Sequence, residues 1–516
     1  MNKAAEKLPV QYIQLIQELP KIIGIEESKV QIFSKNGDLC IFAGVHIERI
    51  KAAVLQVLER FHIPSTYGIE NGYINIIFDD TYIINLMDQM FLAPVLLPEN
   101  NEESASHIFV EYYGQDIVKR PGVGVVRNVI TGNVVSQLLM SSGAHITKNT
   151  LICNKGVESS KVVYQYMKEK SNGTPLSETD IFSLRNKLSS HYMIAEGSEI
   201  KDGVDFSTQT GMEIIDTMRS IRENNPTHIA ALNELTHISE ASFTKEFENL
   251  GMSFHVIHNQ YEHSESTQKL LELLKNYIEI DERGISFIGI NSKILTLLNA
   301  FGEETYLLRD IAFYYEMYLQ GHSRFCLVVS SDQLEHISRV QIILQKILGL
   351  DMEFEVIDHA MLVVKGKGKD AAQKIYLKDL TETLETSIRG INPDLEQSSV
   401  AKISYACLVF EILKSNMRST LNFSIDQLKD INGLQGVYSL YSYIRIYKLR
   451  QSLEGIPENN DSEDLLPAIS REIIKHLISV KRGVSEVNPS IIIQSTVRLC
   501  RYLNSFYAKH RVLNGE

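Results

Sequence analysis

The first hundred residues alternate helix-like spacing of apolar positions with short runs rich in apolar and β-branched residues. Two such runs, Asp38–Phe42 and Gly72–Phe78, predict strands, and the second reads YINIIF after a glycine. The stretch LPENNEESAS (97–106) carries almost no large apolar side chain, which is typical of a linker. We therefore predict a small α/β module over residues 1–105.

A different pattern begins at residue 107, where the strand-like run HIFVEYYG leads through QDIVKRPGVG into the helix-like VVRNVITGNVVSQLLMSSG. Glycines between a strand and a helix let backbone N–H groups approach a phosphate, and the helix start adds partial positive charge. Further on, FCLVVSS (325–331) and MLVVKG (361–366) flank the helical segment HISRVQIILQKIL. This order predicts a Rossmann-like parallel sheet covered by helices over residues 106–395.

Only helical patterns follow residue 396. The clearest are VAKISYACLVFEILKS, VYSLYSYIRIYKLRQSLEG, LPAISREIIKHLISVKRG and SIIIQSTVRLCRYLNSFYAKH. They predict an all-α bundle over residues 396–516. A chain of 516 residues exceeds what one core supports, so three domains are expected.

Composition excludes several classes of protein. No run of about 18 apolar residues occurs, so no membrane span is expected. The five cysteines are widely spaced, which predicts neither a zinc site nor a disulfide framework, and a reducing cytoplasm fits best. His255, His258 and His263 lie close together but lack the spacing of a helical metal motif, so we expect no metal ligands.

Charge is distributed unevenly along the chain. The net charge of −13 argues against indiscriminate coating of DNA. From Glu396 onward, however, 15 Lys and Arg stand against 12 Asp and Glu, whereas the rest of the chain has 36 against 52. A locally cationic end suits phosphate contacts as well as it suits a solvated surface, so charge alone leaves both readings open.

Residues 110–146, VEYYGQDIVKRPGVGVVRNVITGNVVSQLLMSSGAHI, resemble the stretch of arginyl-tRNA synthetases that contains the His-Val-Gly-His motif. Gly122 and Val125 stand where that family has its two histidines. The positions that match the family are Ile117, Lys119, Val123, Gly124, Arg127 and Gly132. The resemblance implies a class I synthetase, here a divergent or degenerate paralogue, with Gly124 in its ATP-handling segment.

Two further segments carry the most specific part of the resemblance. TYLLRDIAFYYEMYLQG (305–321) is similar to the family's Tyr-x-x-Arg-Asp-Ile-Ala segment, and SSDQLEHISRV (330–340) to its Asp-Gln-x-x-His segment. On a helix, the i,i+4 pair Tyr306 and Asp310 shares one face, and a carboxylate there can pair with a guanidinium. The substrate-binding residues implied by the resemblance are Asp116, which stands in the place of an asparagine, Tyr306, Asp310, Asp332, Gln333 and His336.

The family's second signature, Lys-Met-Ser-Lys, falls in VVKGKGKDAAQKIYLKDL, where residues 366–369 read GKGK. If ATP with Mg²⁺ is used, the resemblance implies Lys367 and Lys369 as substitute phosphate contacts. In family members that lack this motif, a lysine just upstream of the histidine motif substitutes, and Lys119 stands there. A solvated turn is the alternative reading of the loop.

The helical end resembles the family's anticodon-binding domain, and residues 1–95 resemble its amino-terminal module that touches the tRNA elbow. Aromatic and guanidinium planes stack on splayed bases, while cations meet phosphates. The residues implied to bind tRNA are Tyr438, Tyr441, Tyr443, Arg445, Arg498 and Arg501. Without the resemblance, these tyrosines would be read as core or interface residues.

The leading hypothesis is an arginyl-tRNA synthetase-like protein that binds tRNA and arginine or an analogue, with ATP if it is active. Donors aimed at the charge of a transition state contribute about 3 kcal/mol each, so the altered motifs argue against ordinary aminoacylation. The alternatives are an active arginine–tRNA ligase with substitute lysines, a non-catalytic tRNA- or synthetase-binding module, and a transferase of a specialised pathway.

Overall fold

The computed structural model describes residues 19–26, 29–34, 37–92, 107–173, 181–184, 209–290, 293–300, 302–364, 375–453 and 466–510. These residues form two compact units. We call residues 105–140 and 144–434 the central unit, and residues 1–104, 141–143 and 435–516 the terminal unit. The candidate linker at 97–106 lies outside the described residues.

The central unit is built on a five-stranded, all-parallel sheet in the order β12-β11-β5-β6-β7. Numbered along the chain, these strands stand in the order 5-4-1-2-3, which is the arrangement of a nucleotide-binding α/β fold. The predicted Rossmann-like fold is confirmed. The strands are β5 (His107–Asp116), β6 (His145–Cys153), β7 (Val256–Asn259), β11 (Arg324–Ser330) and β12 (Glu353–His359).

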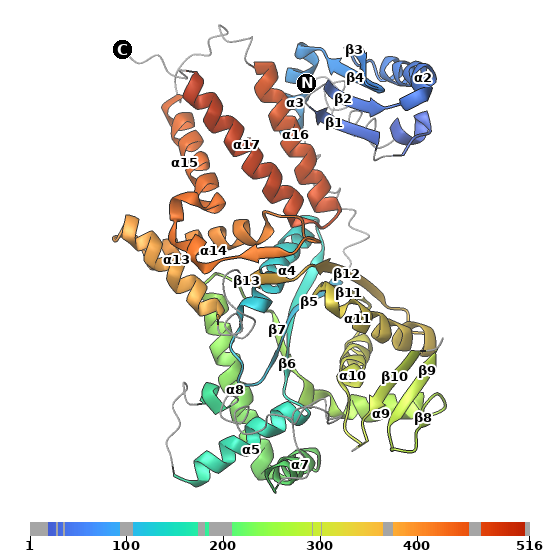
Figure 1. Cartoon of the computed structure of the whole chain (residues 1–516), viewed down its shortest axis with the longest axis vertical. Coiled ribbons are helices and arrows are strands. Elements are labelled where there is room, and N and C mark those ends of the chain that lie inside the picture. The colour runs from blue at the N-terminus through green and yellow to red at the C-terminus, as the bar shows by residue number, and fades with distance from the viewer. Residues whose placement is uncertain are drawn as a thin grey trace. The chain divides into compact units, whose positions relative to one another are not determined.

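Helices cover both faces of this sheet (Figure 1). Helix α10 packs with α9 and α11 against Phe109, Leu151 and Phe325 on one face, and α8 places its phenylalanines against Tyr113 on the other. The helices are α4 (Val123–Ser141), α5 (Val157–Ser171), α7 (Gln209–Arg222), α8 (Pro226–Glu248), α9 (Ser264–Leu274), α10 (Tyr306–Leu319), α11 (Leu334–Gln341), α13 (Leu377–Ile391) and α14 (Gln397–Leu413). The short turns are η5 (Gln260–His263), η6 (Ser331–Gln333), the π-helical η7 (Ile342–Ile347), η8 (Ile425–Lys429) and η9 (Ile431–Gly433).

Helix α4 is anchored from within. Gly132 allows the helix to approach β5 closely, because an added Cβ would lie 2.1 Å from Cγ of Tyr112. The fully buried Arg127 donates from Nη1 to the carbonyl oxygens of Ala360 and Ser419, and from Nη2 to that of Asn416. The match of Arg127 and Gly132 to the family pattern therefore has a structural reason.

One strand prediction was wrong. The partner of β11 after the intervening helix is β12, whereas residues Leu362–Val364 form β13, which pairs with β14 (Leu421–Phe423) in a separate two-stranded sheet. Strand β12 reads EFEVIDH, and its alternating acidic residues reflect its position at the sheet edge, where one side faces water. A three-stranded antiparallel sheet, β8 (Glu279–Ile280), β9 (Ser286–Ile290) and β10 (Lys293–Leu298), completes the unit.

The terminal unit joins the two ends of the chain. Its antiparallel sheet has the order β1-β2-β4-β3, and the strands predicted near residues 38–42 and 72–78 are β2 and β4. The elements are β1 (Val30–Ser34), β2 (Gly37–Phe42), η3 (Gly44–His46), α2 (Ile47–Arg60), β3 (Ser65–Glu70), β4 (Tyr73–Phe78), α3 (Asp80–Leu92), α15 (Gln435–Leu453), α16 (Leu466–Ser485) and α17 (Pro489–Lys509).

Helix α16 holds this sheet. Ile474 and Leu477 enter the apolar core formed by the sheet, α2 and α3. Arg471 donates from Nε to the buried Asp38 carboxylate at 2.8 Å and from Nη2 to the Phe78 carbonyl at 2.9 Å. The predicted small α/β module and helical end thus share one core.

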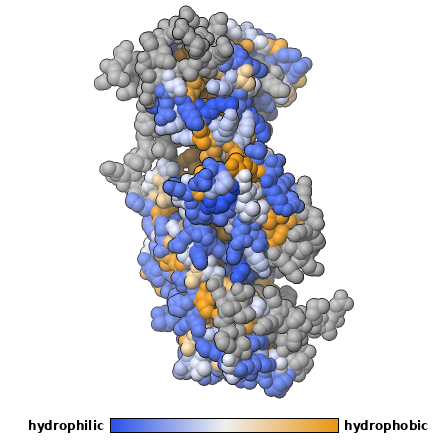
Figure 2. Space-filling view, turned by 90° about the vertical axis from the view of Figure 1, so that its left-hand side faces the viewer, coloured by the Kyte–Doolittle hydropathy of each residue, from blue (hydrophilic) through white to orange (hydrophobic). Residues whose placement is uncertain are grey.

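Helix α4 is the one described helix that is long and apolar enough to cross a membrane, judged by length and composition. It is mostly buried within the central unit, which is the usual situation of a core helix. The face drawn in Figure 2 presents mainly hydrophilic residues, with hydrophobic ones in small scattered groups.

Candidate functional site

The order of the sheet marks where a ligand is expected to bind. Connections from β5 run toward β6 on one side, whereas β11 lies on its other side, so the topological switch point falls between β5 and β11. In open parallel sheets, ligands bind outside the carboxyl ends of the strands at this point. Asp116 ends β5, and Ser330 ends β11 immediately before η6 and α11.

A β-bulge decides which side chains of β5 face this site. Glu111 pairs with Asn149 of β6, but the next pair is Tyr113 with Thr150, so Tyr112 is an extra residue. Beyond the bulge, Gly114 pairs with Leu151 and Asp116 with Cys153. Because paired residues share a face and alternate along a strand, Glu111, Gly114 and Asp116 all lie on the face covered by α10. Without the bulge, Glu111 and Asp116 would point to opposite faces.

Helices α10 and α11 add a polar cluster on the same face. His336 Nε2 lies 2.8 Å from the buried Asp310 carboxylate, and its ring stacks on Tyr306 with centroids 4.4 Å apart. The Tyr314 hydroxyl donates to Glu111 Oε2 at 3.2 Å, and burial keeps the pKa of that phenol well above its usual value. The structure therefore brings together Tyr306, Asp310 and His336, as the sequence predicted, and adds Glu111 and Tyr314.

Glu111 is the functional candidate that sequence reasoning missed. Burial first, and then the charge of Asp310, raise the pKa of its carboxyl to about 8, while hydrogen bonding from Tyr314 lowers it. A pair of carboxylates at a site that cannot hold both charges comfortably is a strong attractor for a cation. The available signal was a lone acidic residue within the otherwise apolar and aromatic run HIFVEYYG.

Two cationic side chains near this site, Arg309 and Lys155, are held in place by contacts with Glu304. Arg309 donates from Nη1 to the Glu304 carbonyl at 2.8 Å, and Lys155 pairs with the Glu304 carboxylate at 2.9 Å. Gly156 has φ +86°, and a Cβ added there would lie 2.9 Å from Arg309 Nη1, so glycine makes room for this guanidinium. Cys153 lies nearby, and burial together with Asp116, Asp310 and Glu111 raises the pKa of its thiol.

The loop from β5 to α4 has little to offer a triphosphate. Lys119 pairs with Asp116 at 3.5 Å and is half-exposed. The Val123 N–H donates to the Ile375 carbonyl and the Val125 N–H to that of Gly122, which leaves fewer amides at the start of α4 for a phosphate. Gly124 is exposed, and a Cβ there would meet nothing within 4 Å.

Strain is stored in the same loop. Val118 has φ +56°, which a β-branched residue rarely adopts, and its N–H donates to Ser239 Oγ at 2.7 Å. The predicted second phosphate loop, with Lys365, Lys367 and Lys369, lies outside the described residues. The segment that follows it forms an antiparallel bridge from Tyr376 to Gly122. The described residues that follow the second signature in the sequence therefore lie beside Gly122 of the first.

The remaining substrate candidates lie at the surface. Asp332 and Gln333 are exposed in η6, one turn before His336. His336 contacts the buried Asp310 carboxylate, whereas the structure shows no such contact for Asp332 or Gln333. Within the parts of the chain that the structure describes, no group of three or more His, Cys, Asp or Glu side chains could hold a metal ion.

The candidate tRNA residues lie in the terminal unit. Tyr441 and Tyr443 are exposed on α15, and Tyr438 is half-buried. The Arg445 guanidinium stacks over Tyr441 at 4.7 Å and over Tyr507 of α17 at 4.6 Å, and it donates to Asn504 at 3.1 Å. Figure 1 shows α15 alongside α17. On α17, Arg498 pairs with Glu472 at 3.3 Å and Arg501 is exposed.

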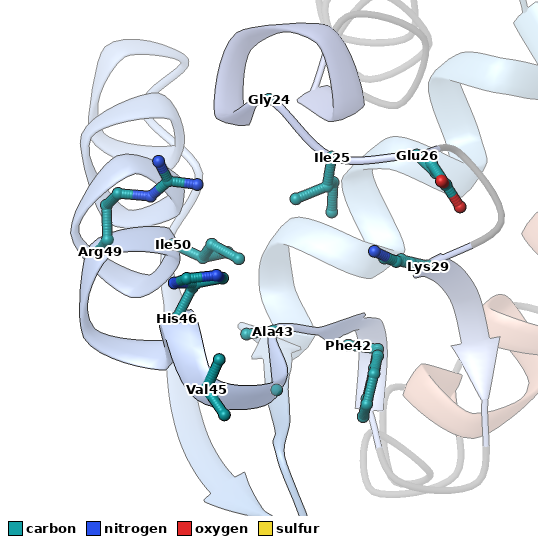
Figure 3. A pocket seen from close by; sticks show the side chains of 11 residues that line it. Gly24, Ile25, Glu26, Lys29, Phe42, Ala43, Val45, His46, Arg49 and Ile50 are labelled. Carbon is teal, nitrogen blue, oxygen red and sulfur yellow. The ribbon is translucent and has the colours of Figure 1, made fainter.

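The terminal unit also contains a pocket of about 570 Å³ at one end of its sheet. Phe42, Val45 and His46 line it from the connection between β2 and α2, with Arg49 on α2 and Lys29 across the opening (Figure 3). An exposed aromatic ring beside two cations is a combination that binds single-stranded nucleic acid, although the acidic Glu26 also lines this pocket.

Comparison with known proteins agrees with this geometry. The sequence model for "tRNA synthetases class I (R), catalytic domain" matches residues 88–405. An arginine–tRNA ligase of Phocaeicola vulgatus is 24% identical over 508 residues, covering 88% of this chain and 83% of the relative. One of Levilactobacillus brevis is 23% identical, covering 86% and 80%.

Solved structures share the fold. The arginyl-tRNA synthetase of Thermus thermophilus superposes with a TM-score of 0.70 at 16% identity, covering 98% of this chain and 92% of its own. That of Plasmodium falciparum gives 0.68 at 16% identity, covering 100% and 94%. The predicted three-part architecture of a class I synthetase with a helical anticodon-binding-type end is thereby confirmed as a fold. Since the matched sequence model spans well over half of the chain, the protein belongs to the arginine-type class I tRNA synthetase family.

Proposed function

We propose that this protein is an arginyl-tRNA synthetase-like protein that binds arginine at the switch point of its parallel sheet and tRNA through its terminal unit, while activating free arginine with ATP only weakly. The observation that carries the proposal is the pair Glu111 and Asp310, two buried carboxyl groups on one face of the sheet. A guanidinium matches such groups in charge and in planar geometry.

Each residue of the pocket has a proposed part in holding arginine. Asp310, oriented by His336, and Glu111, oriented by Tyr314, accept hydrogen bonds from the guanidinium. The exposed Tyr306 ring covers the aliphatic stem. Asp116 faces the α-ammonium at the other end of the exposed groove above Gly114.

The nucleotide side supports weak activation. Adenylate formation requires donors aimed at the charge that develops on phosphorus and on the leaving pyrophosphate. Gly122 and Val125 have no polar side-chain hydrogen, and the start of α4 donates two of its amides to protein carbonyls. Lys119 and Arg120 are the described cations just before that helix start, and the Arg120 guanidinium stacks over the Phe182 ring. ATP would supply the adenylyl group that activates the amino acid, with pyrophosphate leaving, and Lys119, with Lys367 and Lys369, is the set proposed to contact it.

The tRNA side is proposed from the aromatic face of α15 and α17. Arg445, held between Tyr441 and Tyr507, presents stacked planes of the kind that bind unpaired bases. The pocket beside Phe42 is a second proposed contact for RNA. The cytoplasm stays the predicted location.

Calorimetric titration of the full chain with L-arginine and with L-citrulline tests the proposal. Citrulline has nearly the same shape but carries no positive charge. We expect saturable heat with arginine and none with citrulline, and a gel shift with arginine tRNA. Equal heats for both ligands, or no arginine binding between pH 7 and 9, would contradict the proposal.

An active ligase is the second candidate, and the observation that favours it is Lys119 beside the start of α4. Arginine-dependent exchange of pyrophosphate into ATP, lost in Lys119→Met, would establish it. A non-catalytic tRNA-binding module predicts the gel shift without arginine heat.

A further inference from the structure

The charged residues along β5 indicate whether the site favours free arginine or arginine whose carboxyl group is esterified or amidated. This step rests on the proposed function of the same site. On the face set by the bulge, Glu111 lies at the inner end, Asp116 at the mouth, and Gly114 between them carries no side chain. A Cβ at Gly114 would make only ordinary contact, 3.6 Å from the Leu151 carbonyl, and the residue is exposed, so the face of β5 above it is open to solvent.

The positions of the two acids along β5 suit the two cations of arginine. Glu111 and Asp116 are paired with Asn149 and Cys153, four residues apart on β6, so their backbone positions are about 13 Å apart at about 3.3 Å per residue. An extended arginine spans roughly 7 Å from guanidinium carbon to α-nitrogen, which fits between these positions with room for a hydrogen bond of about 2.9 Å at each end. A ligand whose guanidinium lies against Glu111 can therefore place its α-nitrogen on the Asp116 side.

A buried polar group at the inner end also points to a ligand. Asn149 is fully buried at the position paired with Glu111, where hydrogen bonding from its side-chain amide lowers the pKa of the Glu111 carboxyl, and its Oδ1 has no donor among the described residues. A buried acceptor without a donor costs free energy unless a bound molecule supplies the donor. A guanidinium has five N–H groups, enough for Glu111, Asp310 and this amide oxygen.

The mouth is where free arginine and its derivatives differ. Free arginine carries a carboxylate on the same carbon as its α-ammonium, so the group that attracts the ammonium repels the carboxylate. Lys119 offsets part of this repulsion, but it is half-exposed and already paired with Asp116. The other two cationic side chains near this site, Arg309 and Lys155, are both bound to Glu304. An ester or amide of arginine keeps both cations and has no carboxylate.

We propose that Asp116 makes this pocket selective for an arginyl group whose carboxyl is already joined through an ester or amide, with the arginyl ester at the 3′ end of an RNA as the natural ligand. The RNA source follows from the family to which the chain belongs. The protein would then hold charged tRNA in preference to free arginine.

Calorimetry of the full chain tests this selectivity with L-arginine, L-arginine amide and agmatine, which lacks the carboxyl altogether. The interaction of two unit charges about 5 Å apart corresponds to roughly fourfold in affinity in bulk water and more than a hundredfold near a protein surface. Because Lys119 offsets part of it, the expected preference is about tenfold. We expect the amide and agmatine to bind about tenfold more tightly than arginine. In Asp116→Asn the preference should fall to about twofold or less, and in Lys119→Met it should grow. Glu355→Gln, an exposed acid on the edge strand β12, is the matched control and should leave the preference unchanged.

The outcomes separate this inference from the function on which it rests. If arginine binds as tightly as its amide to the native chain, the selectivity is overturned while the proposed arginine site stands. If neither binds, the proposed site itself is overturned.

The RNA source is tested with the stable amide 3′-(L-arginyl)amino-3′-deoxyadenosine and with the dipeptide Arg-Ala. Tighter binding of the adenosine derivative supports an RNA-borne arginyl group. Tighter binding of the dipeptide would overturn it in favour of peptide amino termini.

Discussion

The two ends of the candidate site differ sharply in chemistry. At the amino-acid end, Glu111 and Asp310 are each held by a partner, Tyr314 and His336. At the nucleotide end, the helix start has Gly122, Gly124 and Val125, and the amides of Val123 and Val125 donate to neighbouring carbonyls. Groups that are costly to bury persist only where something uses them. The contrast supports the proposal that this fold recognises an arginyl group.

The largest expected effect is at the amino-acid end. Asp310→Asn removes a buried negative charge that would pair with the guanidinium of arginine. The binding free energy should fall by about 3 kcal/mol, which is more than a hundredfold in arginine affinity. Calorimetry measures this loss, with Glu355→Gln as control. An affinity within threefold of the native chain would break the comparison, because the buried carboxylates would then have no role in binding.

The pH dependence of arginine affinity is the next effect. Burial raises the pKa of free Glu111 to about 8, and a bound guanidinium favours its ionised form, so binding releases a proton. Affinity should therefore rise from pH 6 to pH 8 and level off above, by up to about 50-fold. Glu111→Gln should bind weakly with a flat profile. A flat profile for the native chain would contradict the assignment.

A smaller effect is expected in the terminal unit. Arg445→Ala removes the guanidinium held between Tyr441 and Tyr507 and should weaken tRNA binding about tenfold, since stacking contributes about 1–3 kcal/mol per base. Filter binding measures it, and Arg450→Ala, an exposed arginine of the same helix, is the control. Arginine heat should not change. Equal losses in both variants would mean that general charge, and not the stacked cluster, binds the RNA.

The smallest effect is expected at the nucleotide end. Gly124→Ala adds a methyl group that meets nothing within 4 Å, so unfolding free energy should change by less than about 1 kcal/mol and arginine affinity by less than twofold. Thermal denaturation and calorimetry check both. A large loss of arginine affinity would show that the nucleotide end and the amino-acid end act as one site, and the difference between them would no longer hold.

Much of the fold could be predicted because its signals are local. The run HIFVEYYG and the helix after it are β5 and α4, and the tyrosine-rich segment is α15. The sequence analysis assigned the run MLVVKG, which forms β13, to the parallel sheet and missed β12. The reason is that the edge strand β12 alternates acidic and apolar residues, whereas the short apolar run MLVV looks more like a buried strand.

The site was harder to predict for a physical reason. Tyr306, Asp310 and His336 could be named from helical spacing and resemblance, and they do meet. Glu111 could not, because without the bulge at Tyr112 a five-residue separation from Asp116 places the two acids on opposite faces. Register is a property of two strands together, and one strand's sequence does not reveal it.

The central claim is that this chain still binds an arginyl group and has lost most of the contacts that bind and orient the triphosphate of ATP. Arginine-dependent exchange of labelled pyrophosphate into ATP, measured with the full chain and tRNA at saturating arginine, tests it most directly. We predict exchange close to the level of a blank, and far below the rate of an active arginine–tRNA ligase measured alongside, in the same preparation that gives saturable arginine heat. Arginine-dependent exchange at a rate comparable with that of the active ligase would contradict the account.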